Sequence, residues 1–168
     1  MSLIDAPVRN VMTKNVKTIE ATKKLSDCVK SMSDSNIGSL VVVGKDQTPV
    51  GIFTERDLVK KIAEKGHGVL SQSMSQVMHT PLTIISPGAT IWDAVTLMGR
   101  ADIRRLPVAE NGHLVGILTE KDVIRLILAQ QHLLLESVSE SFPTATREQL
   151  RGIAGHFGIE RPPGRASA

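Results

Sequence analysis

The chain has 168 residues, of which 41% are hydrophobic and 22% are charged, and its formal net charge is +3. This length allows one compact domain, or two small halves that share a core. The low net charge and the small number of aromatic residues, three Phe and one Trp, argue against a nucleic-acid-binding surface. The single cysteine, Cys28, excludes an intrachain disulfide and a multi-cysteine metal site. Without a signal-peptide pattern or a long apolar run, we expect a cytoplasmic protein.

The first half of the chain predicts five elements in the order β-α-β-β-α. A short strand over 16–19 precedes an amphipathic helix near 25–32, whose apolar residues recur at helical spacing. Apolar runs at 40–43 and 50–53 flank the polar turn GKDQT, which predicts a β-hairpin. The last helix is expected to begin at Thr54.

The second half repeats this order 65 or 66 positions later. A strand over 82–85, a helix near 91–98, hairpin strands over 106–109 and 115–118, and a helix from Thr119 are expected. GIFTERD at 51–57 and GILTEKD at 116–122 are identical at five of seven positions. Because one such unit is too small to close its own core, we predict an α+β fold. In it, the two copies pack about a pseudo-twofold axis with the sheets inside and the helices outside.

The repeated T-E-x-D motif marks the start of the last helix in each copy. Thr54 and Thr119 suit the N-cap position, and Asp57 and Asp122, three residues later, suit a capping box. Helix initiation alone is therefore one reading. A glycine three residues upstream lets another group come close, and the exposed N–H groups of the helix start suit a phosphate. A carboxylate beside them suits the two hydroxyl groups of a ribose, which favours a binding site.

The duplicated unit resembles a tandem pair of cystathionine-β-synthase (CBS) domains, and in particular the stand-alone bacterial proteins built from one such pair. The resemblance rests on V-M near each start, at 11–12 and 77–78, and on G-I-x-T-E-x-D before each last helix. We expect a first CBS motif over 8–66, a linker over 67–73 and a second motif over 74–130. A C-terminal extension over 131–168 is expected to be partly helical with a disordered end.

The resemblance implies two clefts between the motifs that bind adenosine-containing ligands. AMP, ADP, ATP, S-adenosylmethionine and NAD-type dinucleotides all remain candidates. The family's ribose-binding residues correspond to Thr54, Asp57, Thr119 and Asp122. Strand residues are expected to line adenine pockets, with core packing as the alternative role, and these are Val16, Thr18, Leu82 and Ile84.

Phosphate-binding candidates distinguish the two copies. Arg104 and Arg105 precede L-P-V in the second copy, whereas Gly38 and Ser39 stand at the matching positions of the first. We expect a cleft with Thr54 and Asp57 that one of these arginines completes, and it should bind phosphate more tightly than the other cleft. Two further cations, Arg56 and Lys121, stand next to the aspartates and are also candidates.

No nucleophile elbow, Walker A motif or dinucleotide-binding glycine motif occurs in the sequence, so we predict no enzyme activity. The expected function is that of a regulatory, signal-transducing homodimer. It would need no cofactor or metal, bind an adenine nucleotide as its regulatory ligand and act on an unknown downstream protein. Two alternatives are a ligand-free oligomerisation scaffold and a nucleic-acid-binding protein that acts through the basic tail.

Overall fold

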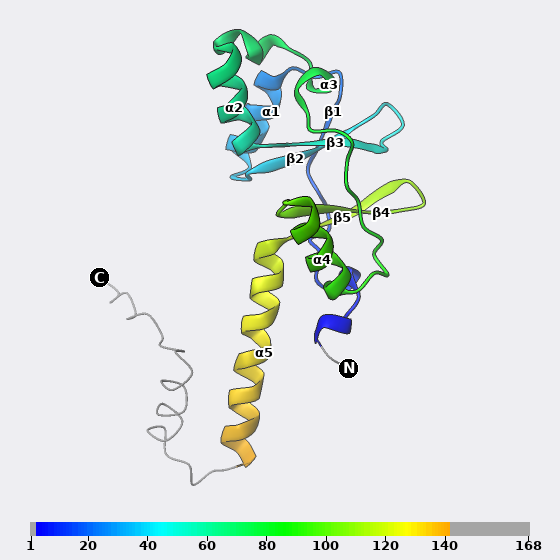
Figure 1. Cartoon of the computed structure of the whole chain (residues 1–168), viewed down its shortest axis with the longest axis vertical. Coiled ribbons are helices and arrows are strands. Elements are labelled where there is room, and N and C mark those ends of the chain that lie inside the picture. The colour runs from blue at the N-terminus through cyan, green and yellow to red at the C-terminus, as the bar shows by residue number, and fades with distance from the viewer. Residues whose placement is uncertain (1–2, 142–168) are drawn as a thin grey trace, which may run out of the picture. The chain divides into compact units, whose positions relative to one another are not determined.

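A computed structural model of the chain describes residues 3–141 (Figure 1). The expectation for 142–168 falls outside these residues. The first part runs through η1 (Leu3–Asp5), η2 (Val8–Asn10), β1 (Thr18–Glu20), α1 (Leu25–Asp34), β2 (Ser39–Val43), β3 (Pro49–Thr54), α2 (Glu55–Lys65), η3 (His67–Ser71) and α3 (Met74–Val77). The second part consists of α4 (Ile91–Ala101), β4 (Arg105–Glu110), β5 (His113–Thr119) and α5 (Glu120–Ser141). The predicted mixed α+β class is confirmed.

The two sheets differ by one strand. In the first, β1 is parallel to β2, and β2 is antiparallel to β3. The second contains only the hairpin β4–β5. The strand predicted over 82–85 was wrong, because only Ile85 pairs, through a parallel bridge to Val108. Pro81 and Pro87 flank this stretch, and proline has no N–H to donate to a strand partner.

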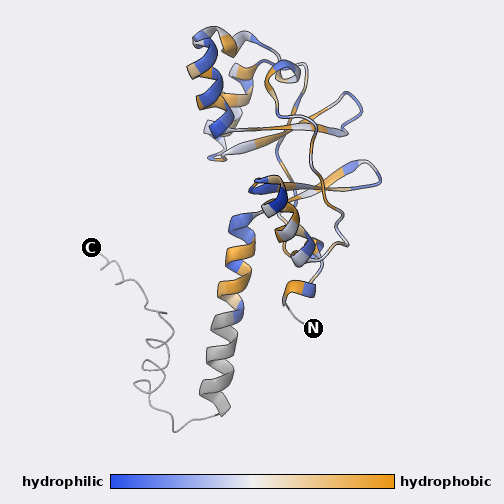
Figure 2. Ribbon diagram, in the orientation of Figure 1, coloured by the Kyte–Doolittle hydropathy of each residue, from blue (hydrophilic) through white to orange (hydrophobic). Residues whose placement is uncertain are grey.

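Each motif has its own apolar core beneath its helices. As the helical spacing predicted, α1 buries Leu25, Cys28 and Met32, and α4 buries Ile91, Ala94 and Met98. In Figure 2 the strands are largely hydrophobic and the hairpin turns hydrophilic. Burial raises the pKa of the Cys28 thiol to about 11, so the thiol stays protonated at neutral pH.

The inner face of the first sheet is buried as well. Val41 and Val43 are almost fully buried, yet strand alternation places them on the face opposite Leu40 and Val42, which contact the α1 core. Figure 1 shows α1 and α2 on the outer side of this sheet and the second motif on its other side. The helices are therefore outside and the sheets inside, as predicted.

The segment that leads into each repeat packs on the other copy. Val8 belongs to the core around α4, whereas Met74 and Val77 belong to the core around α1. Residues 67–71, expected as part of a linker, form η3 and bury Val69 in that same first core. Each copy in sequence therefore supplies part of the other copy's core.

Backbone hydrogen bonds hold each leading segment on the hairpin of the other motif, and these two places are called the crossings below. The N–H of His79 donates to the carbonyl of Ile52 at 2.8 Å, and the N–H of Ile52 donates back at 3.2 Å. Thr13 and Ile117 form the equivalent pair, at 2.9 and 3.0 Å. Each leading segment thus adds one short antiparallel bridge to the hairpin of the other motif.

A methionine covers a glycine at each crossing. A Cβ at Gly51 would lie 2.5 Å from the Sδ of Met78 and 3.0 Å from the carbonyl oxygen of His79. A Cβ at Gly116 would lie 2.5 Å from the Sδ of Met12. The missing side chains do let another group come close, as expected, but that group is a methionine of the protein and not a ligand.

Replacing either glycine by alanine should therefore destabilise the fold. Met78 can shift, but the His79 carbonyl is part of the backbone bridge, so we expect Gly51→Ala to lower the free energy of unfolding by about 1–3 kcal/mol. Gly116→Ala should lower the free energy of unfolding by a similar amount. Gly68→Ala is the matched control, because a Cβ there meets no atom within 4 Å. Urea denaturation measures all three, and equal midpoints for Gly51→Ala and Gly68→Ala would refute the close-approach explanation.

The crossings also predict which fragment folds. Fragment 17–79 contains every buried residue of the first core, whereas fragment 1–66 lacks Val69, Met74 and Val77. We expect a cooperative thermal transition by far-UV circular dichroism for 17–79 and none for 1–66. Because 17–79 exposes Val41 and Val43, it should also self-associate. A cooperative transition of 1–66 would contradict this view of the core.

Candidate functional site

Each T-E-x-D motif folds into a reciprocal capping box. Thr54 is the N-cap of α2, and its N–H and Oγ1 donate to Oδ2 of Asp57 at 2.9 and 2.7 Å. The N–H of Asp57 donates back to the Thr54 Oγ1 at 3.3 Å. Thr119 and Asp122 repeat the arrangement, at 2.9, 2.6 and 3.3 Å. The predicted capping is confirmed, and in the first box Thr54 donates to Oδ2 of Asp57 and not to Oδ1.

A third box shows that capping alone does not make a site. Thr90 and Asp93 at the start of α4 form the same hydrogen bonds, at 2.9, 2.7 and 3.1 Å, on the exposed surface. The Thr90 hydroxyl and backbone N–H lower the pKa of Asp93, so its carboxylate is ionised at neutral pH. A site therefore needs further groups around the box.

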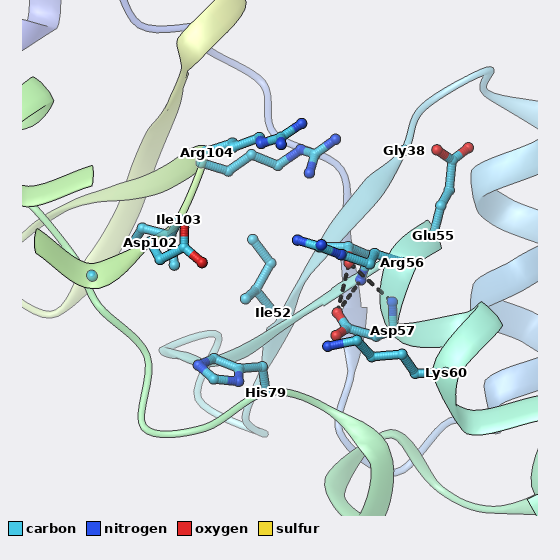
Figure 3. A pocket seen from close by; sticks show the side chains of 13 residues that line it. Gly38, Ile52, Glu55, Arg56, Asp57, Lys60, His79, Asp102, Ile103 and Arg104 are labelled. Carbon is cyan, nitrogen blue, oxygen red and sulfur yellow. Dashed lines mark hydrogen bonds between the residues drawn. The ribbon is translucent and has the colours of Figure 1, made fainter. Parts of the chain in front are cut away.

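Such groups surround Thr54 and Asp57. A pocket of about 630 Å³ opens beside the start of α2, with walls from both motifs (Figure 3). Six of the predicted ligand-binding residues line it: Gly38, Thr54, Arg56, Asp57, Arg104 and Arg105. The remaining wall consists of Ile52, Glu55, Lys60, His79, Ala101, Asp102 and Ile103. The structure thus places the arginines of the second copy beside the capping box of the first.

The cations of the pocket come from two sides. Arg56 and Lys60 extend from α2, whereas Arg104 and Arg105 come from the start of β4 in the second motif. In Figure 3 the Arg104 and Arg56 side chains extend into the space between the two motifs. Four side chains that carry full positive charge therefore outnumber the three carboxylates of the wall, so the pocket favours an anion.

Gly38 of the first motif lies close to Arg105 of the second within the pocket. A Cβ at this position would lie 2.9 Å from the Oε2 of Glu55 and 3.2 Å from the Nη2 of Arg105. The absence of a side chain therefore leaves room for Arg105 to reach over the first motif. Arg104, by contrast, has its Nε 3.8 Å from the Oε2 of Glu120, with both side chains exposed. Such an exposed pair is weak, so Arg104 can leave it for a ligand.

Sequence reasoning missed Lys60 and His79. Lys60 stands one helical turn after Asp57, so helix periodicity could have placed it on the same side. His79 had no local signal, because it reaches the pocket through its backbone bridge to Ile52 of the other copy.

The other predicted residues lie elsewhere. Thr119, Lys121 and Asp122 stand at the start of α5, and the Oδ1 of Asp122 lies 3.7 Å from the Nη1 of Arg125. The four adenine-pocket candidates are not part of the wall described above. Val16 and Leu82 are half-buried and Thr18 and Ile84 are exposed.

Two kinds of feature are absent from residues 3–141. No helix there is long and apolar enough to cross a membrane. Over the same residues, no group of three or more His, Cys, Asp or Glu side chains could hold a metal ion.

Comparison with known proteins agrees with the repeat. The CBS domain family model matches residues 8–64 and 74–129. The uncharacterized protein MJ1404 of Methanocaldococcus jannaschii is 36% identical over 135 residues, which are 73% of this chain and 32% of that protein. The chain spans about a third to three fifths of the length of the first curated relatives that it matches.

Solved structures share the fold. The CBS-domain containing protein ATU1752 from Agrobacterium tumefaciens matches with a TM-score of 0.69 and 29% identity, over 75% of this chain and 96% of that one. The CBS domain pair of protein MJ0100, in complex with 5′-methylthioadenosine and S-adenosyl-L-methionine, matches with a TM-score of 0.68 and 21% identity, over 74% and 98%. The second likeness concerns the fold alone. The chain belongs to the CBS domain family, and its two matched segments form a tandem CBS pair, a regulatory module.

Proposed function

We propose that this CBS pair senses an adenosine-containing ligand, bound in the pocket beside Thr54 and Asp57, without catalysing a reaction. AMP, ADP, ATP, S-adenosylmethionine and NAD-type dinucleotides share the adenosine group. The observation that carries the proposal is the convergence of the first motif's capping box with the second motif's Arg104 and Arg105 on one pocket.

The pocket offers separate places for ribose and phosphate. The Oδ1 of Asp57 can accept from a ribose hydroxyl, because Oδ2 is held by Thr54. The N-terminus of α2 and the side chain of Arg56 lie next to it and suit a phosphate. Arg104 and Arg105 can then hold the same phosphate from the second motif.

This arrangement gives the ligand a means of regulation. A nucleotide that contacts both motifs favours the relative arrangement in which Asp57 and the two arginines reach it together. The two ligands in the complex of MJ0100, which shares the fold, also contain an adenosine group. The cationic wall favours a phosphorylated member of that class.

The first test asks whether Asp57 has a role beyond capping. A melting panel with the five ligands should identify one that stabilises the protein, by about 2.7 kcal/mol at 100 times its dissociation constant. Asp57→Asn should weaken that ligand about tenfold to a hundredfold in calorimetry, through the loss of a charged acceptor.

Asp93→Asn is the matched control, because Asp93 makes the same cap outside the pocket. Both variants should lose about 0.5–2 kcal/mol of stability from the cap. Equal ligand affinity in both variants, or a panel in which nothing binds, would reject the proposal and leave the scaffold alternative.

The second test asks whether the arginines bind phosphate. Changing Arg104 and Arg105 together to Ala should weaken AMP or ATP about tenfold or more, because charge-assisted contacts to the phosphate are lost. Adenosine has no phosphate and should bind the double variant as well as it binds the parent. Calorimetry with AMP and adenosine separates the cases, and an equal loss for both ligands would show that the arginines do not bind phosphate.

A further inference from the structure

The glutamate of each T-E-x-D motif is fixed beside the residue that precedes the first hairpin strand of its own motif. The N–H of Glu55 donates to the carbonyl of Gly38 at 3.2 Å, and the N–H of Glu120 donates to the carbonyl of Arg104 at 3.0 Å. Each glutamate is the first residue of its helix, α2 or α5. The two copies therefore place the same side chain beside residues that differ in charge.

This difference gives Glu55 a cation of the other motif as its neighbour. In the second motif, the Oε2 of Glu120 lies 3.8 Å from the Nε of Arg104. In the first motif, Gly38 offers no charge at the corresponding position. A Cβ at Gly38 would lie 2.9 Å from the Oε2 of Glu55 and 3.2 Å from the Nη2 of Arg105. The carboxylate of Glu55 and the guanidinium of Arg105 therefore flank Gly38 and attract each other.

Glu55 competes with a ligand for Arg105. Arg105 is half-buried, whereas Arg104 is exposed, and charges that are partly buried are screened less by solvent. The attraction of Glu55 for Arg105 is therefore less weakened than that of Glu120 for Arg104. In Figure 3, Glu55 and Asp57 project to different sides of the start of α2. A phosphate that binds Arg105 must thus replace Glu55 there, while the capping box of Asp57 stays intact.

The charge balance of the pocket wall limits the charge of its ligand. The wall has four cationic side chains and three carboxylates, so one positive charge is uncompensated when His79 is neutral. AMP has one phosphate group, with about two negative charges at neutral pH, and ATP has three phosphate groups. Because the repulsion from Glu55 grows with each negative charge of the ligand, the wall suits a monophosphate better than a triphosphate.

We propose that Glu55 is a specificity-determining residue of the pocket. It holds Arg105 in the unliganded protein and disfavours highly charged ligands, so that a nucleoside monophosphate is preferred over a triphosphate. This inference rests on the proposed function, because it concerns the ligand of the same pocket.

The decisive variant is Glu55→Gln in the full chain, which keeps the size of the side chain and removes its charge. We expect it to bind AMP about three- to fivefold more tightly than the parent does, and ATP about tenfold or more, because the repulsion removed grows with ligand charge. Adenosine is uncharged and should bind both proteins equally. Calorimetry with the three ligands measures these ratios, and about 0.5 M salt should reduce the gains by screening the charges.

Glu110→Gln is the matched control, because it removes the same charge from an exposed residue at the far end of β4. It should leave all three affinities unchanged. If Glu55 acts through Arg105, the gain for AMP from Glu55→Gln should be smaller in an Arg105→Gln background.

The outcomes separate this inference from the proposed function. Equal gains for AMP and ATP, a gain for adenosine, or a gain for AMP that does not depend on Arg105 would each overturn the role of Glu55. A parent that binds its ligand while Glu55→Gln leaves the affinities unchanged would overturn this inference alone. A parent that binds none of the three ligands would reject both.

Discussion

The structure depends on the exchange of leading segments between its two motifs. Met12 covers Gly116 of the second hairpin, and Met78 covers Gly51 of the first. Hydrogen bonds to each hairpin lie directly beside these contacts. Because each core takes buried residues from the segment that precedes the other copy, separation of the copies would open both cores. The same exchange places His79 in the wall of the pocket, so the contact that holds the fold together also builds the candidate site.

The capping boxes share one local geometry but lie in different surroundings. The boxes at Thr54, Thr90 and Thr119 have nearly the same hydrogen-bond distances. The box at Thr54 lines a pocket that Arg104 and Arg105 of the other motif also line. Since the local geometry is equal, any difference in function between the boxes must come from the residues that the neighbouring motif places around them. A T-E-x-D motif therefore indicates the start of a helix wherever it occurs. It indicates a candidate site only where the other motif places further residues beside it.

Patterns within single segments of the sequence were enough to predict most helices and strands and some of the residues that line the candidate site. The helical spacing of apolar residues located α1 and α4, and the repeated T-E-x-D located the starts of α2 and α5. Periodicity describes one segment at a time, so it could not reveal that leading segments pack on the opposite copy. That contact brought His79 to the pocket. The repeat also predicted a strand over 82–85 to match the one over 16–19, but only Ile85 pairs there, and prolines limit the pairing.

The two copies have diverged where the fold permits it. Buried positions remain apolar in both copies, as Leu40 and Leu106 or Met32 and Met98 show. Each of these residues packs in the core of its own motif, and the two cores are built alike. Positions that face a cleft or the surface carry no such requirement. Gly38 and Arg104 therefore differ in size and charge although both stand at the same point of the repeat. A symmetric frame built from constrained positions thus supports an asymmetric surface, in which one copy contributes the capping box of the pocket and the other contributes its arginines.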